Sequence, residues 1–238
     1  MPPKQNVDQP AQPRPSDGCL MASADWDRLW RRPARSPTQG DNRYAHGARS
    51  GYLRYVSGLL TEVDCGGKSF IELGCGSALL SRCLFDVLPF GSAVVLDFSP
   101  QALELAKANC CDRDIRVVLA DVLSWDTGEW FDLAMSVGLI EHFSGPALTR
   151  AVARHAELLK EDGYAIVFMP RRGLLWPVLS VVNRLQGIRE EPPRDAELLR
   201  VMESVGLRVE KVQRFGAGLL LGVLARKCPA RTPGSHAT

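Results

Sequence analysis

The sequence predicts an α/β fold built on a mostly parallel sheet, and three observations support this. Short apolar runs at 69–73, 93–97, 115–119, 131–136 and 164–169 alternate with helical patterns at the spacing of βαβ units. The first run ends in a glycine-rich turn, and polar residues follow the next three runs. Strands this apolar are expected to be covered by helices on both faces.

Local signals mark the helices between these strands. Ser99 and Pro100 suit the N-cap and first turn of a helix that continues through residue 107. Another helix is expected from 146 to 159, with Gly163 as its stop before the fifth strand.

The C-terminal part predicts two further strands. Residues 196–205 read as a helix, and the runs 207–215 and 218–225 read as strands around a Gly-Ala-Gly turn. A close pair at the end of a parallel sheet predicts an antiparallel last strand, which gives seven strands in all.

The chain is expected to form one domain. Residues 1–20 are rich in proline without hydrophobic periodicity and predict a disordered tail; the domain spans 21–227, and 228–238 form a loose tail. Within it, 21–64 predict a helical cap, in which Ser23 is the N-cap of a first helix.

Composition excludes several function classes. With 238 residues, a net charge of +2 and 45% apolar residues, the chain argues against a strongly electrostatic nucleic-acid binder. No apolar run is long enough to cross a bilayer, and the N-terminus has no signal-peptide pattern. Seven cysteines without metal-ligand spacing predict reduced thiols, no metal site and a cytoplasmic location.

The turn after the first strand predicts a ligand site. Gly74 and Gly76 permit positive φ and close approach of a ligand to bare backbone. The helix N-terminus beyond them favours a carboxylate or phosphate. Glu72 ends the strand at the edge where open α/β sheets bind ligands.

Further polar groups follow the neighbouring strands. Asp97 ends the second strand, where a carboxylate can accept both hydroxyls of a ribose. Asp121 and Val122 follow the third strand and could recognise an adenine edge, and 136–143 follow the fourth. These groups are expected to share one cleft.

Together these motifs resemble the class I S-adenosylmethionine-dependent methyltransferases. The residues that carry the resemblance are Glu72 to Ala78, Asp97, Asp121 with Val122, Ser136 to Phe143, and the turn from Leu158 to Gly163. It covers about residues 40–227, implies their Rossmann-like fold, and is greatest for the small-molecule branch, which includes quinone and natural-product methyltransferases. Ala78 departs from the family, which often has a third glycine there.

The resemblance implies a role for each residue of the cofactor site. Glu72 would organise the glycine loop and the methionine ammonium of S-adenosylmethionine, and Asp97 would hold its ribose. Phe98 would pack on the adenine. The remaining cofactor-binding residues by this resemblance are Gly74, Gly76, Asp121, Val122, Ser136 and Val137.

An NAD-dependent oxidoreductase is the nearest competing interpretation. Its fingerprint requires a glycine where this chain has Leu79, and it does not need an acid such as Glu72 before the glycines. Methyl transfer therefore accounts better for the turn.

The acceptor site is predicted less sharply. His142 is the candidate base for an acceptor that must lose a proton, or else a loop histidine lining the cleft. Glu141 could partner His142 or bind a metal. Tyr44, Phe143 and Trp176 complete the candidate acceptor pocket; Trp26 and Trp30 either close over it or belong to the core.

The insertion 171–193 follows the fifth strand, where a lid over the acceptor would lie. Its apolar residues favour a lid over a lipophilic acceptor, plain cover of the core, or a helix in peripheral contact with a membrane. The fourth strand lacks the motif by which methyltransferases of nucleic-acid bases grip an amine. The predicted function is methyl transfer by in-line displacement to a small molecule. The alternative is a methyltransferase-like cofactor-binding or regulatory domain that acts through a protein partner.

Overall fold

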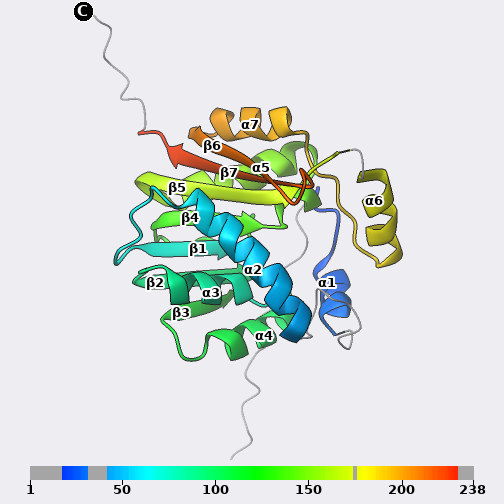
Figure 1. The fold of residues 1–238 in the computed structure, drawn as a ribbon, viewed down its shortest axis with the longest axis horizontal. Helices are drawn as coiled ribbons and strands as arrows, with labels where there is room; N and C mark the ends of the chain where they lie inside the picture. The colour runs from blue at the N-terminus through cyan, green and yellow to red at the C-terminus, as the bar shows by residue number, and fades with distance from the viewer. Residues whose placement is uncertain (1–17, 32–41, 174–175, 230–238) are drawn as a thin grey trace, which may run out of the picture.

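The computed structural model describes residues 18–31, 42–173 and 176–229, with the backbone alone for 42–50. It contains a seven-stranded sheet with helices on both faces (Figure 1). The strands are β1 (Ser69–Leu73), β2 (Ser92–Asp97), β3 (Ile115–Leu119), β4 (Phe131–Val137), β5 (Leu159–Pro170), β6 (Leu207–Phe215) and β7 (Leu220–Lys227).

The strand order is β3-β2-β1-β4-β5-β7-β6. The pairs among β1 to β5 are parallel, and β7 runs antiparallel to both β5 and β6. The predicted Rossmann-like α/β fold with an antiparallel last strand is therefore confirmed. The order reverses between β1 and β4, the place where open sheets of this kind bind ligands.

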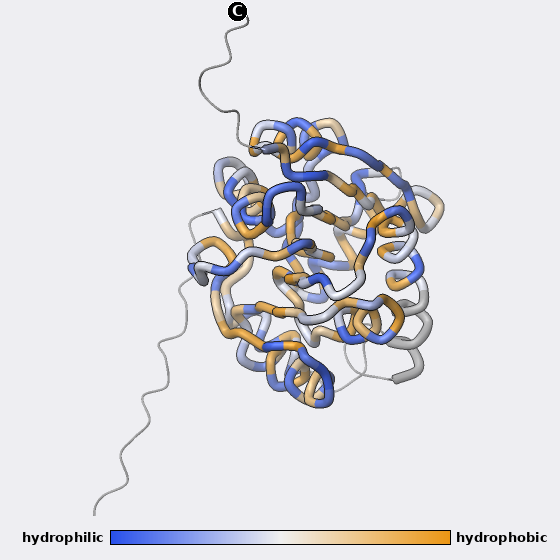
Figure 2. The backbone as a smooth tube through the Cα atoms, turned by 90° about the vertical axis from the view of Figure 1, so that its left-hand side faces the viewer, coloured by the Kyte–Doolittle hydropathy of each residue, from blue (hydrophilic) through white to orange (hydrophobic). Residues whose placement is uncertain are grey.

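Two helical layers cover the sheet. On one face lie α2 (Asn42–Leu59), α3 (Leu79–Val87) and α4 (Pro100–Cys110); on the other lie α5 (Gly145–Glu157) and α7 (Asp195–Ser204). Neighbouring strand residues supply the two cores in alternation: Phe70 packs with the first layer and Ile71 with the second. The helices change repeatedly between hydrophobic and hydrophilic along the chain (Figure 2), as expected for elements with one buried face.

Two helices lie beyond the carboxyl ends of the parallel strands, α1 (Ser23–Trp30) and α6 (Trp176–Leu185), on the right of Figure 1. No residue of α6 is buried, and Val178, Val181 and Leu185 are exposed. Plain cover of the core therefore does not explain the apolar residues of this helix. A short 3₁₀ helix, η1 (Ile140–His142), follows β4.

Two local expectations need correction. Ala22, rather than Ser23, is the N-cap of α1, because the Ala22 amide donates to the Asp25 carboxylate (3.1 Å) while the Ser23 hydroxyl donates to the Phe98 carbonyl (3.0 Å). Gly163 does not stop a helix: α5 ends earlier, and β5 begins at Leu159 and passes through Gly163.

Two residues that precede the expected domain boundary at 21 contact the loop that follows β4. Cys19 forms a β-bridge with Phe143, and the Leu20 amide donates to the His142 carbonyl at 2.9 Å. Residues 18–20 thus pair with the loop after η1. The rest of the predicted N-terminal tail, 1–17, lies outside the described residues, as does most of the C-terminal one.

No helix among the described residues is long and apolar enough to cross a membrane. The seven cysteines all lie in the described part of the chain, and none of them is in a disulfide there.

Candidate functional site

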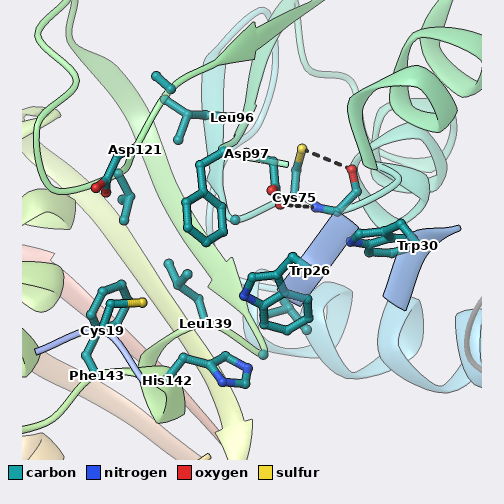
Figure 3. Close-up of a pocket in the computed structure, with 17 residues that line it drawn as sticks. Cys19, Trp26, Trp30, Cys75, Leu96, Asp97, Asp121, Leu139, His142 and Phe143 are labelled. Carbon is teal, nitrogen blue, oxygen red and sulfur yellow. Dashed lines mark hydrogen bonds between the residues drawn. The ribbon is translucent and has the colours of Figure 1, made fainter. Parts of the chain in front are cut away.

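A cavity of about 220 Å³ opens at the carboxyl ends of β1, β2, β3 and β4 (Figure 3). The glycine turn, the strand ends and α1 supply most of its wall. It is lined by Cys19, Trp26, Trp30, Gly74, Cys75, Gly76, Leu96, Asp97, Phe98, Ala120, Asp121, Val122, Val137, Gly138, Leu139, His142 and Phe143.

The glycine turn needs its glycines for space as well as for conformation. Gly74 and Gly76 have φ of +68° and +54°. A Cβ at Gly74 would lie 2.7 Å from the Leu139 side chain, and one at Gly76 would lie 2.7 Å from the Trp30 ring. The turn is thus held between two side chains from distant segments.

Asp97 ties the glycine turn to the end of β2. Its Oδ2 accepts from the Gly76 amide (2.8 Å) and its Oδ1 from the Ser99 amide (2.9 Å), and its side chain also faces the cavity. Burial raises the pKa of this carboxyl above its usual value, although both amide bonds oppose that shift. Lone pairs remain on both oxygens for a ligand hydroxyl.

Glu72 lies behind the turn and is absent from the cavity wall. Only 3% exposed, it accepts a hydrogen bond from the Ser81 hydroxyl of α3. Burial raises its pKa to about 7, and the nearby Asp97 adds to the shift. This geometry suits the predicted role in organising the loop; its role toward an ammonium group stays a prediction.

Phe98, Asp121 and Val122 all line the cavity. That they surround an adenine stays a prediction. The Asp121 Oδ1 accepts from the Leu123 amide at 2.9 Å, so this acid also shapes the turn after β3.

Ser136 and Val137, both predicted at the cofactor site, point in opposite directions because successive strand residues alternate. Val137 lines the cavity. Ser136 is fully buried beneath it, with its Oγ 2.9 Å from Nε2 of His155 on α5. Burial lowers the pKa of His155 to about 4, so this pair is neutral at pH 7.

Helix α1 supplies two aromatic walls. Trp30 covers the glycine turn, and Trp26 meets the His142 ring edge-on, with ring centroids 4.9 Å apart (Figure 3). Asp27 fixes the helix by accepting from the Ser99 hydroxyl at 2.6 Å. The two tryptophans therefore belong to the cavity wall rather than to the core.

Of the acceptor-side predictions, His142 and Phe143 line the cavity. His142 is 5% exposed, its Nδ1 lies 2.7 Å from the Arg189 carbonyl, and burial lowers its pKa to about 4. Glu141 is buried away from the cavity wall. Trp176 lies outside the wall as well, and the Tyr44 side chain falls outside what the structure describes.

Sequence reasoning missed Cys19 and Leu139. Cys19 belongs to a segment read as tail, and nothing local indicates that it pairs with Phe143. Leu139 stood inside the predicted segment 136–143, but only the fold shows that it presses on Gly74.

Residues 70–163 match the family model described as "Methyltransferase domain". The family match, the relatives and the fold together support a class I S-adenosylmethionine-dependent methyltransferase. They also support an enzyme with methyltransferase activity.

Two curated relatives are O-methyltransferases. The chain is 27% identical over 175 residues to a ubiquinone biosynthesis O-methyltransferase of Thiobacillus denitrificans, covering 67% of this chain and 72% of that protein. It is 28% identical over 96 residues to a malonyl-[acyl-carrier protein] O-methyltransferase of Anoxybacillus flavithermus, covering 40% of this chain. The match spans only 36% of the latter protein.

Among solved structures, a Haloferax volcanii complex of the Trm112 methyltransferase activator with a putative methyltransferase contains a similar chain. The TM-score is 0.68 at 16% identity, over 79% of this chain and 95% of that one. At this identity the likeness shows the fold alone.

Proposed function

We propose that this protein transfers a methyl group from S-adenosylmethionine to a hydroxyl of a small acceptor that has an apolar part. The lining of the cavity supports S-adenosylmethionine as the cofactor. The two relatives described above are O-methyltransferases, which supports a hydroxyl as the methyl acceptor. Trp26, Leu139 and Phe143 make part of the cavity wall apolar, which supports an acceptor with an apolar part. The reading as an NAD-dependent oxidoreductase loses support, because the family match is to methyltransferases.

The residues present fit the cofactor. Bare backbone at Gly74 and Gly76 leaves room that a Cβ would fill, Asp97 offers carboxylate lone pairs beside that backbone, and Asp121 lies farther along the wall. When bound, the cofactor supplies a sulfonium methyl that is already activated for transfer.

The chain's own contribution is mainly orientation. Holding an acceptor oxygen in line with the methyl can supply roughly 7–11 kcal/mol of the barrier. His142 is the proposed proton acceptor for a hydroxyl, since its ring is neutral and lies in the wall.

The observation that carries the proposal is the Asp97 carboxylate, which faces the cavity and the glycine turn together. Calorimetry with S-adenosylhomocysteine tests it on Asp97→Ala, Asp97→Asn and the exposed control Asp126→Ala. Losing two hydrogen bonds to a charged group, each about 1.5–3 kcal/mol, predicts at least about 100-fold weaker binding for Asp97→Ala. The Asn variant, which keeps one oxygen, is expected in between.

Unchanged affinity in folded Asp97→Ala would refute the ribose assignment. Methyl transfer itself is tested by incubating the wild type with S-adenosylmethionine and a panel of phenolic and aliphatic hydroxyl compounds. Cofactor binding without turnover on any of them would favour the alternative of a regulatory, methyltransferase-like domain acting through a partner.

A further inference from the structure

A buried carboxylate beside the cavity has one oxygen without a hydrogen-bond partner. Glu141, on η1, is 2% exposed, and its Oε2 makes no hydrogen bond within the described chain. Burying a carboxylate oxygen without a partner is costly, so an unsatisfied one calls for an explanation.

Two neighbours complete a set of possible ligands. A ring nitrogen of His142 and one carboxylate oxygen each of Glu141 and Glu190 lie within 4.8 Å of one another. Glu190 is half-buried and comes from the end of the insertion, whereas the other two follow β4. No ion pair to either glutamate occurs among the described residues.

Backbone contacts hold the two segments together. The Glu191 amide donates to the Glu141 carbonyl at 2.7 Å, and the Arg189 carbonyl lies 2.7 Å from His142 Nδ1. The Asn183 amide group donates to the Glu190 carboxylate. Outer contacts of this kind orient the ligands of metal sites, and a histidine that donates to a carbonyl keeps a lone pair on its other ring nitrogen.

We propose that Glu141, His142 and Glu190 bind one divalent transition-metal cation such as Zn²⁺ or Co²⁺. Two carboxylates neutralise its charge, and the imidazole favours these ions over Mg²⁺, which prefers oxygen ligands alone. Ligand distances of about 2.0–2.2 Å require the three side chains to close around the ion when it binds.

Three protein ligands leave coordination positions open, as in catalytic zinc sites. His142 also lines the cavity, so an acceptor hydroxyl could take such a position. The bound cation would lower the pKa of that hydroxyl, so that its proton would pass to bulk water and leave an alkoxide or phenolate to attack the methyl. That role rests on the proposed function. In the metal-bound protein it replaces proton acceptance by His142, whereas cation binding stands by itself.

The test is calorimetric titration of the metal-free full-length chain with Zn²⁺ and separately with Mg²⁺, without cofactor or acceptor. Co²⁺ provides a visible-absorption readout. Wild type is expected to bind one Zn²⁺, with Mg²⁺ at least 10-fold weaker. Glu141→Gln and Glu190→Gln should each weaken Zn²⁺ binding at least 10-fold, while Glu191→Gln, an exposed neighbour, should bind as wild type does.

Circular dichroism of each variant checks that it folds. Absence of Zn²⁺ binding in wild type, or equal binding in all the variants as expected for cysteine-bound metal, would overturn the proposal. Either result leaves the Asp97 experiment intact, so failure of the metal site and failure of the proposed cofactor site are distinguishable.

Discussion

The two sides of the cavity are built differently. The side formed by the glycine turn, Asp97 and Asp121 comes from the ends of three neighbouring strands, β1, β2 and β3. The side around His142 is assembled from three segments far apart in sequence: residues 18–30, η1 and the end of the insertion. We refer to these as the strand-end side and the assembled side.

The two sides differ in how readily amino-acid substitutions can change them. On the strand-end side the backbone of the strand ends and of the glycine turn fixes where each polar group lies, so the positions of these groups follow from the geometry of the sheet. On the assembled side the site depends on side chains and loop contacts, which can change without altering the sheet. Acceptor choice is accordingly expected to vary more readily than cofactor choice.

The largest effect is expected from Gly76→Ala, where the strand-end side meets α1. The new Cβ would lie 2.7 Å from the Trp30 ring at a φ of +54°. Backbone strain of about 1–2 kcal/mol and overpacking of about 1–3 kcal/mol predict a total loss of about 3 kcal/mol in unfolding free energy. Binding of S-adenosylhomocysteine should weaken at least 10-fold.

Gly128→Ala is the matched control, since it has a φ of +61° and nothing within 4 Å of its Cβ. It should lose only the strain, about 1–2 kcal/mol, and bind cofactor normally. Chemical denaturation of both variants separates the two terms; equal losses would mean that Trp30 does not press on the turn.

An effect of similar size is expected from pH, with opposite sign beneath the two sides. The pKa of Glu72, under the strand-end side, is raised to about 7 in the folded protein. Folding is therefore more favourable when the Glu72 carboxyl is protonated, and the free energy of unfolding falls as pH rises from 4.5 to 7. The pKa of His155, under β4, is lowered to about 4, so stability falls as pH drops from 6.5 to 4. Each amounts to about 3 kcal/mol at about 1.4 kcal/mol per pKa unit.

Denaturation of wild type, Glu72→Gln and His155→Gln between pH 4 and 8 isolates each group as a difference, because all other titrations cancel. Wild type minus Glu72→Gln should fall with rising pH, and wild type minus His155→Gln should rise. Parallel curves for a variant and wild type would show that its residue does not titrate as described.

The smallest effect is expected at Ala78, where the family often has glycine. Its φ is +53°, a conformation that favours glycine, but its methyl is fully buried. Relief of strain by Ala78→Gly is offset by the lost methyl, worth about 0.8 kcal/mol, and by the freer unfolded chain. Stability should change by less than about 0.5 kcal/mol.

Ala217 provides the comparison, with a φ of +56° on an exposed turn. Ala217→Gly loses no buried contact and should gain about 0.5–1 kcal/mol. Thermal unfolding of the two variants measures this difference, and a larger gain at Ala78 would contradict the offset.

The sequence predicted the strand-end side well because its signals are local. The bounds of β1, β3 and β6 agree with the prediction, and Gly74, Gly76 and Asp97 meet at the cavity because parallel strands end at one edge. That these residues bind S-adenosylmethionine stays a prediction.

The assembled side could not be predicted in the same way. Glu190 lies close to Glu141 although the two are 49 residues apart in the sequence. The segment that carries Glu190 is irregular and has no hydrophobic periodicity from which its position could be predicted. Ser136 was assigned to the site by its neighbourhood, yet the alternation of β4 turns it toward His155. Pairing of Cys19 with Phe143 depends on a bridge outside the sheet.

Helix α1 contacts both sides of the cavity, and this has a consequence for how the binding of one ligand affects the binding of the other. Its eight residues carry both Trp30, over the glycine turn, and Trp26, against His142. The first ligand to bind immobilises this helix, and its binding free energy is reduced by the conformational entropy that the helix loses. A second ligand then binds to a helix that is already immobilised, so its binding free energy is not reduced in this way. Cofactor and acceptor are therefore expected to bind with positive cooperativity, even where they share no contact.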